Sequence, residues 1–256
     1  INLDTTVNTL DASVTGIGTI TVDETNAITL SDVDTANGLI TITALGAITA
    51  TDVVSSTDAD ANDISLSGTS IGVGVVNAGS TAGDVTLTAS TGAITDNNGI
   101  NVNVTADLLT ATSNTGINLD TTVNTLDASV TGIGTITVDE TNDITLSDVD
   151  TANGLITITA LGAVTATDVV SSTDADANDI SLSGTSIGVG LINAGSTAGD
   201  VILTASTGAI TDNNGASVNV IADLLTATSS TGINLDTTVN TLDASVTGIG
   251  AITLDE

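Results

Sequence analysis

The sequence lacks every basic residue and every aromatic one. Its 256 residues contain no Lys, Arg, His, Cys, Pro, Met, Phe, Tyr or Trp, whereas Asp and Glu number 31, for a net charge of −31. Without a cationic side chain, no side-chain salt bridge can form. The carboxylates can be balanced only by solvent cations, bound divalent metal or a basic partner. Nucleic acid is excluded as a partner because its phosphates require Lys or Arg.

The missing residue types exclude other classes as well. Ser and Thr lack the His or Lys base that would activate them as nucleophiles, so we expect no enzyme. No apolar run approaches the roughly 18 residues of a membrane span, so we expect no membrane insertion. Without aromatic rings to fill wide gaps, Ala, Val, Ile and Leu must pack in a narrow, regular interior. The first residue lies inside a repeated phrase, so we expect a segment of a longer protein.

The residues that are present alternate between apolar and hydroxyl side chains. In GLITITA, residues 38–44, Ile40 and Ile42 alternate with Thr41 and Thr43. This period of two is typical of a strand with one buried face. Similar phrases recur at 19–24, 27–32, 63–68 and 84–90. The pattern predicts an all-β protein.

Two repeats are nested in the chain. The phrase INLDTTVNTLDASVTGIG begins at Ile1, Ile117 and Ile233, a period of 116 residues. Residues 1–116 and 117–232 differ at only nine positions, and 233–256 begin a third copy. No linker separates the copies. We therefore expect three repeat units, 1–116, 117–232 and 233–256, within one continuous solenoid.

A shorter rhythm lies inside each copy. Strand phrases begin near Thr19, Leu39, Asp63 and Asp84, at spacings of 20, 24 and 21 residues. Such spacing indicates a parallel β-helix, or β-solenoid, with about 20–24 residues per coil and five or six coils per 116-residue repeat. The alternative is an array of immunoglobulin-like sandwiches of roughly 100 residues each. Three observations favour the solenoid: the strand sequence is repeated within each copy, Trp and Tyr are missing, and no linkers separate the copies.

Two Asp-rich segments in each copy are candidate Ca²⁺ sites. Hard cations prefer several oxygen ligands on a short loop, and alternating Asp side chains supply them. The candidate ligands in the first segment and its copy are Asp58, Asp60, Asn62, Asp63, Asp174, Asp176, Asn178 and Asp179. Those in the second segment and its copy are Asp32, Asp34, Asn37, Asp148, Asp150 and Asn153.

Neither segment has the ligand spacing of an EF-hand, and the GGxGxD repeat of calcium β-rolls is missing. Ordinary Asx-turns between coils explain the same residues. Paired carboxylates could also cleave a sugar. However, the Asp pattern recurs 116 residues later, which is typical of a repeated structural element rather than of a single active site. Ca²⁺ is thus the one cofactor that the sequence suggests. The alternative is that the same residues only form turns and bind no metal.

Thr-X-Thr patterns such as Thr41/Thr43 and Thr86/Thr88 suggest a flat array that could bind ice. The sequence interrupts this array with Ser65/Ser67, with Asn101/Asn103, and with Ile202 at the copy of Thr86. Outward-facing Thr is also common on strands, because β-branched residues favour them. On these grounds we expect ordinary strand surface rather than an ice-binding face.

Two segments carry a resemblance to a known family. GDVTLTASTGAIT (83–95) and GLITITALGAIT (38–49) resemble the strand repeats of filamentous-haemagglutinin-like giant bacterial adhesins and related β-strand-repeat surface proteins. The resemblance covers the whole chain as a match of composition and rhythm. It implies a right-handed parallel β-helix, export, and a shaft at a bacterial cell surface or in a matrix.

Together these patterns predict a structural segment of a long extracellular bacterial fibre or adhesin shaft, acting as a rigid acidic spacer. One alternative is a self-assembling filament subunit, in which solenoids associate with one another. The other is a Ca²⁺-dependent adhesive array. The expected partners are copies of the chain itself and divalent cations.

Overall fold

The computed structural model describes residues 1–256, and every regular element in it is a strand. The 23 strands are parallel and form about 12 turns of β-solenoid, which confirms the predicted fold class. Right-handed winding stays a prediction. No helix has the length and apolar character that crossing a membrane requires. The chain divides into two compact units, Ile1–Thr131 and Gly132–Glu256, which are described separately.

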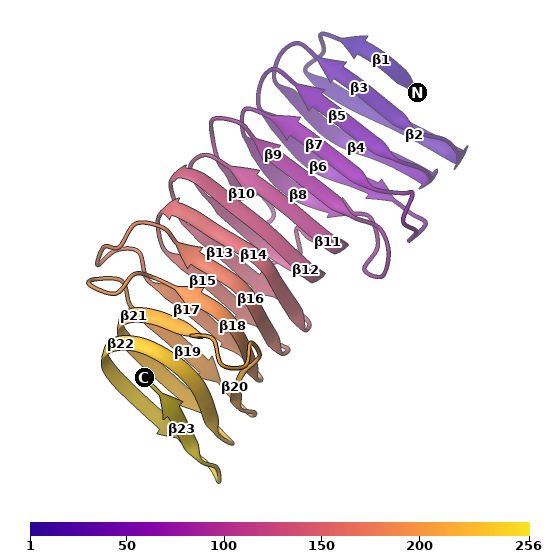
Figure 1. Ribbon diagram of the computed structural model, residues 1–256. Helices are drawn as coiled ribbons and strands as arrows, with labels where there is room; N and C mark the ends of the chain where they lie inside the picture. The colour runs from indigo at the N-terminus through magenta and orange to yellow at the C-terminus, as the bar shows by residue number, and fades with distance from the viewer. The chain divides into compact units, whose positions relative to one another are not determined.

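Unit 1 contains the first eleven strands and most of the twelfth (Figure 1). Their bounds are β1 (Asn2–Thr5), β2 (Thr9–Ile17), β3 (Ile20–Glu24), β4 (Ile28–Asn37), β5 (Ile40–Ala44), β6 (Ile48–Ser55), β7 (Ile64–Gly68), β8 (Ile71–Asn77), β9 (Val85–Ala89), β10 (Ile94–Asp96), β11 (Val104–Ser113) and β12 (Ile117–Ile133).

Unit 2 repeats this arrangement from the end of β12 onward. Its further strands are β13 (Ile136–Glu140), β14 (Ile144–Asn153), β15 (Ile156–Ala160), β16 (Val164–Ser171), β17 (Ile180–Gly184), β18 (Ile187–Asn193), β19 (Val201–Ala205), β20 (Ile210–Asp212), β21 (Val220–Ser229), β22 (Ile233–Val246) and β23 (Ile252–Asp255).

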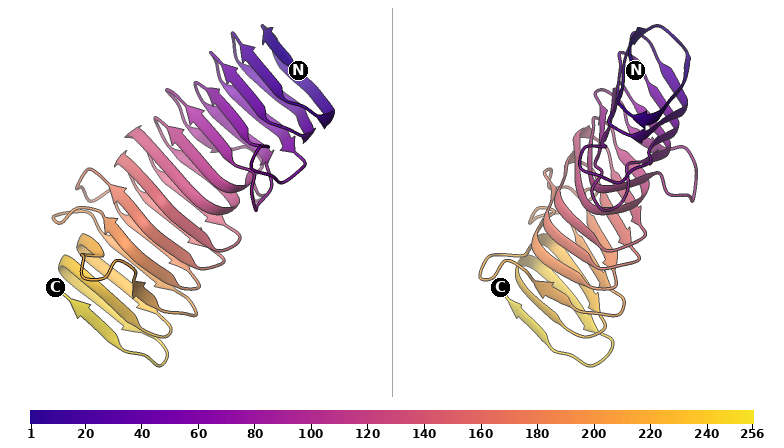
Figure 2. Two further views of the ribbon diagram at one scale, coloured as in Figure 1. Left: turned by 45° about the vertical axis from the view of Figure 1, so that its right-hand side comes forward. Right: turned by 90° about the vertical axis from the view of Figure 1, so that its right-hand side faces the viewer.

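The strands of unit 1 stack in two columns, which Figure 2 shows from two sides. The first column holds β1, β3, β5, β7, β9 and the second halves of β11 and β12, each paired with the next. The second column holds β2, β4, β6, β8, β10 and the start of β12. The chain passes from one column to the other and back in every coil.

Most coils have the predicted length. In the first column Ile20 pairs with Ile40, twenty residues on, and the next three steps take 24, 21 and 24 residues. The last step, from Leu109 to Leu126, takes only 17. This coil is shorter because β12 runs from the second column into the first as one uninterrupted strand.

Aliphatic side chains from both columns fill the interior. Ile40 and Ile42 are fully buried, whereas the alternate Thr41 and Thr43 face outward. Each coil covers the apolar side chains of the coil beside it. Ile1 and Leu3 in the first coil are 45% and 43% exposed, but their repeats Ile117 and Leu119 are 1% and 2% exposed. Burial of stacked aliphatic side chains is therefore the main force that holds successive coils together.

The 116-residue repeat contains an odd number of strand segments. Asn2 of β1 pairs with Thr21 in the first column. Its repeat, Asn118 of β12, pairs with Thr95 of β10 in the second column. Within unit 1 the same residue type therefore stands in opposite columns in the two copies. One repeat makes five and a half coils, in agreement with the predicted five or six.

Candidate functional site

The loop between β6 and β7 places Asp58 against the loop between β8 and β9 of the next coil. Oδ1 of Asp58 accepts the backbone N–H groups of Ala82 at 2.8 Å and Gly83 at 3.1 Å. Oδ2 accepts the N–H of Thr81 at 3.0 Å and its hydroxyl at 2.6 Å. The Thr81 hydroxyl bond is the largest cause that lowers the pKa of Asp58; burial opposes it, and the three backbone bonds add to it.

The same contacts recur in unit 2, where Asp174 binds Thr197, Ala198 and Gly199 at matching distances. Gly79 and its repeat Gly195 make this approach possible, because both have a φ in the left-handed region and a Cβ there would collide with the aspartate. Each of these two carboxylates is thus occupied in joining one coil to the next.

Asn62, also a predicted ligand, closes its own loop. Its side chain is buried, and Nδ2 donates to the carbonyl of Thr57 at 2.7 Å. In unit 2 Asn178 donates to the carbonyl of Thr173 at 2.7 Å and to Oδ1 of Asn153 at 3.0 Å. These bonds close the turn through the amide nitrogen as donor, whereas in an Asx-turn the side chain bonds the backbone two residues on.

Asp63 begins a ladder of aspartates that continues through the following coils. Oδ1 of Asp63 accepts the N–H of Asp84 at 3.1 Å, and Oδ1 of Asp84 accepts the N–H of Leu108 at 3.2 Å. Burial raises the pKa of Asp84; the Leu108 bond opposes this, and the nearby charges of Asp63, Asp107 and Asp60 add to it. Asp179 and Asp200 repeat the ladder in unit 2.

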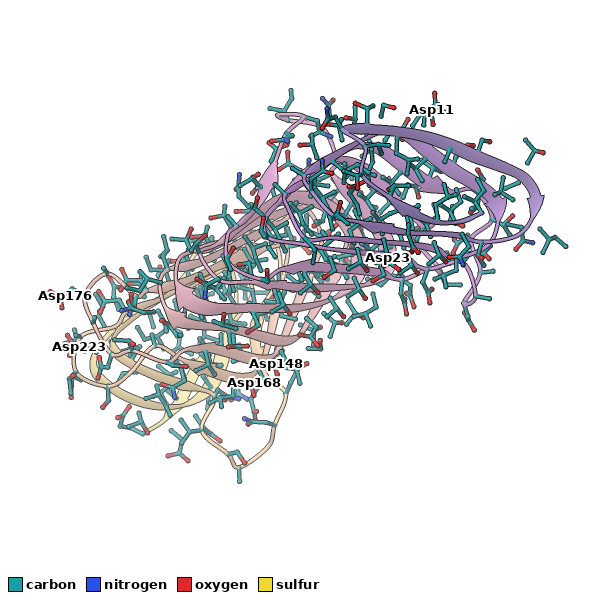
Figure 3. All side chains as sticks on the ribbon, turned by 90° about the horizontal axis from the view of Figure 1, so that it is seen from above. Asp11, Asp23, Asp148, Asp168, Asp176 and Asp223 are labelled. Atoms are coloured by element: carbon teal, nitrogen blue, oxygen red, sulfur yellow. The ribbon has the colours of Figure 1, made fainter.

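Of the residues predicted for the first segment, Asp60 and Asp176 remain directed into solvent. Both are exposed, and Figure 3 shows Asp176 on the outside of its loop. The four predicted ligands of this segment thus have four different roles: an aspartate bonded to the neighbouring loop, a solvent-facing carboxylate, a buried cap, and the first aspartate of a ladder.

The second Asp-rich segment lies on a strand rather than in a loop. Asp32 and Asp34 belong to β4, with Val33 and Thr35 buried between and beside them. Oδ2 of Asp34 accepts the hydroxyl of Ser13 at 3.0 Å. Asn37 ends the strand, and its carbonyl accepts the N–H of Gly18 at 3.0 Å. Asp148, Asp150 and Asn153 occupy the same places on β14.

The strand position of Asp32 creates an acidic ladder on the second column. Asp32 pairs in register with Asp11 of β2, and Asp52 lies on β6, the next strand of the column. Burial raises the pKa of Asp52, and the negative charges of Asp32 and Asp34 raise it further. In unit 2 Asp168 lies beside Asp148 (Figure 3), and the pKa of Asp168 is raised by burial first and then by that neighbour.

No three acidic side chains converge in an arrangement that could hold a metal ion. Carboxylates meet in ladders along the coils, where each has neighbours of its own charge on adjacent strands. Ordered binding of Ca²⁺ by the fourteen predicted ligands stays a prediction.

Sequence reasoning missed the role of the glutamates. The chain has three, and all stand at one repeated position: Glu24, Glu140 and Glu256. Glu24 is buried, and its Oε2 accepts the Thr5 hydroxyl at 2.6 Å and the Val7 N–H at 3.0 Å. Its Oε1 accepts the N–H groups of Thr25 at 2.8 Å and Asn26 at 3.1 Å. One carboxylate thus joins two coils and a turn.

The same contacts explain the protonation behaviour of Glu24. Burial acts to raise its pKa, but the bonds from Thr5, Val7 and the Thr25–Asn26 turn together outweigh burial and lower it. Glu256 repeats the contacts with the Thr237 hydroxyl at 2.8 Å and the Val239 N–H at 3.1 Å. The signal in the sequence was that Glu occurs only at this position of a chain otherwise rich in Asp.

Comparison with protein-family models, with curated proteins and with solved structures finds no match to this chain. The architecture is that of a β-helix repeat protein. The specific likeness to giant adhesins remains an expectation from the sequence.

Proposed function

We propose that this chain is a structural segment of a long extracellular bacterial fibre or adhesin shaft, acting as a rigid acidic spacer. The observation that supports the proposal most directly is the continuous pairing of coils. Ile40, for example, pairs in register with Ile20 on one side and Ile64 on the other. Backbone hydrogen bonds and buried aliphatic side chains then oppose separation of any two neighbouring coils.

The polar joints between coils support the same role. The Asp58 and Asp174 contacts are alike in two copies, and the Glu24 contacts recur at Glu256. A joint repeated in every copy is typical of scaffold, because stacked repeats need the same interface each time. The extracellular bacterial location rests on the resemblance of residues 38–49 and 83–95 to adhesin repeats.

The charge suits a spacer that must stay extended and soluble. With a net charge of −31 and no basic residue, neighbouring copies of the chain repel one another at low salt. Self-repulsion also disfavours collapse of a long array of such copies onto itself. An array that stays extended in this way would act as a spacer between its two ends.

The proposal is tested by measuring length against repeat number. Chains of one, two and three 116-residue copies are imaged by negative-stain electron microscopy and measured by small-angle X-ray scattering. Each copy should add about 26 Å, since five and a half coils are spaced about 4.8 Å apart. Particles that appear as beads on a string, or a length that does not grow in proportion to copy number, would overturn the spacer function.

A further inference from the structure

The outward side chains of the first column form a regular grid of hydroxyls in unit 1. We name as the hydroxyl face the outward residues of four successive strands, β5, β7, β9 and β11. They are Thr41, Thr43, Ser65, Ser67, Thr86, Thr88, Thr110 and Thr112. Pairing brings Thr41, Ser65, Thr86 and Thr110 into one row, and the other four into a second row beside it.

The face contains no charge, and its hydroxyls are free. None of the eight makes a hydrogen bond to another protein group, and all are exposed or half-exposed. Some hydroxyls of the second column are bonded within the protein: Ser31 donates to the carbonyl of Leu10, and the buried Thr35 donates to that of Gly38. The eight hydroxyls can therefore give all of their hydrogen-bonding capacity to something outside the protein.

The grid is periodic in two directions. Outward residues of one strand are about 6.7 Å apart, and those of neighbouring strands about 4.8 Å. No bulge interrupts the pairing among β5, β7, β9 and β11, whereas the pairing of β2 with β4 contains register shifts. Thr is also stiff at χ1 because its Cβ is branched, so the hydroxyls and methyls of the six Thr keep fixed positions.

Unit 2 carries the same grid with one interruption. Its residues are Thr157, Thr159, Ser181, Ser183, Thr204, Thr226 and Thr228, with Ile202 at the remaining place. The interruption expected from Asn101 and Asn103 does not occur. Asn103 is buried beside the second column, where its Nδ2 donates to the carbonyl of Val73 at 2.8 Å. Ser65 and Ser67 keep the hydroxyls in place.

We propose that the hydroxyl face binds the ordered water of an ice surface. An uncharged grid of free hydroxyls in two regular rows, most of them on Thr, matches a ligand that is itself periodic in two dimensions and built only of hydrogen-bonding groups. Thr contributes a donor, an acceptor and an apolar methyl at six of the eight points, and Ser65 and Ser67 contribute the hydroxyl alone. A crystalline polysaccharide is the competing ligand, but sugar sites use aromatic platforms and this chain has none.

The test uses the whole chain and two matched double variants. Thr43→Asp with Thr159→Asp places a charge in the second row of each grid, on its first strand. Thr51→Asp with Thr167→Asp places the same charges on exposed Thr of β6 and β16, in the second column. Circular dichroism and melting curves verify that all three proteins are folded. Ice affinity is measured as the fraction of protein captured by slowly growing ice, and thermal hysteresis is measured at the same concentration.

The wild-type chain and the Thr51/Thr167 variant should be enriched in ice and show thermal hysteresis, and the Thr43/Thr159 variant should lose most of both. If the latter variant unfolds, Thr88→Lys with Thr204→Lys tests the same rows. Wild-type protein that is folded but not captured by ice would overturn the proposal. Equal capture of the two Asp variants would also overturn it, and so would binding to cellulose or chitin powder without binding to ice.

Discussion

The carboxylate of Glu24 accepts the hydroxyl of Thr5 at 2.6 Å, across the interface between two coils. The same side chain accepts three backbone N–H groups, so all of its partners are donors. An aspartate, one methylene shorter, could not reach both coils. This explains why an acidic chain that otherwise uses Asp has Glu at residues 24, 140 and 256.

Glu24→Gln should lower the midpoint of thermal unfolding by several degrees at pH 7. The amide NH₂ would face groups that are themselves donors and leave them unsatisfied. The control is Asp23→Asn, which removes the same charge from the exposed neighbouring residue. Equal melting temperatures for the two variants would contradict the role assigned to Glu24.

The pH dependence of this effect follows from the lowered pKa of Glu24. Its ordinary value is 4.5, and the folded value lies below it. The contribution to stability is therefore complete above the unfolded-state pKa and is lost as the pH falls through the folded pKa. The difference in melting temperature between wild type and Glu24→Gln should shrink as the pH is lowered from 4.5 toward 2.

Asp58→Ala should loosen the loop that Asp58 holds. Hydrogen exchange at the amides of Thr81, Ala82 and Gly83 should become severalfold faster, because each of them donates to the carboxylate. The amides of the unit 2 loop that donate to Asp174 serve as an internal control and should not change. Asp60→Ala, which removes an exposed aspartate from the same loop, should leave the exchange rates as they are. Protection that survives in Asp58→Ala would show that the loop is held by other contacts.

The alternation of Ile and Thr allowed the fold to be predicted, because it shows directly which side of a strand is buried. The register between coils was harder to predict from the sequence, because it depends on turn lengths that vary from coil to coil. The sequence therefore did not reveal that Asp11 and Asp32 are paired neighbours, or that Asp32 and Asp34 lie on β4. It also gave no sign that Asn118 occupies the column opposite to that of Asn2.

Asp52→Asn should stabilise the protein at neutral pH. The folded pKa of Asp52 lies above its ordinary 3.8, because burial and the charges of Asp32 and Asp34 disfavour the carboxylate. In this case the folded state binds the proton more tightly than the unfolded state does. The penalty is therefore present at pH values above the folded pKa and disappears as the pH falls below 3.8.

The measurement for Asp52 is a pair of melting curves at pH 7 and pH 3. Asp52→Asn should melt above wild type at pH 7 and level with it at pH 3. The control is Asp60→Asn, which lowers the net negative charge by the same amount but leaves the ladder of Asp11, Asp32 and Asp52 unchanged. If both variants raise the melting temperature equally, relief of overall charge explains the result and the ladder has no special effect.

Ca²⁺ and simple salt should be distinguishable by their effects on stability. Screening of the 31 carboxylates raises the melting temperature with any salt, because like charges repel less as the Debye length shortens. A site that binds Ca²⁺ only in the folded state adds a further term that grows with the logarithm of its concentration. Melting curves are therefore recorded in millimolar CaCl₂ and in NaCl of equal ionic strength, each against EDTA.

If the predicted ligands bind Ca²⁺, the melting temperature should rise more in CaCl₂ than in NaCl. The double variant Asp60→Asn with Asp176→Asn should reduce this difference. Equal melting temperatures in the two salts would mean that these carboxylates attract cations only as a diffuse cloud, and the Ca²⁺-dependent array would lose its support.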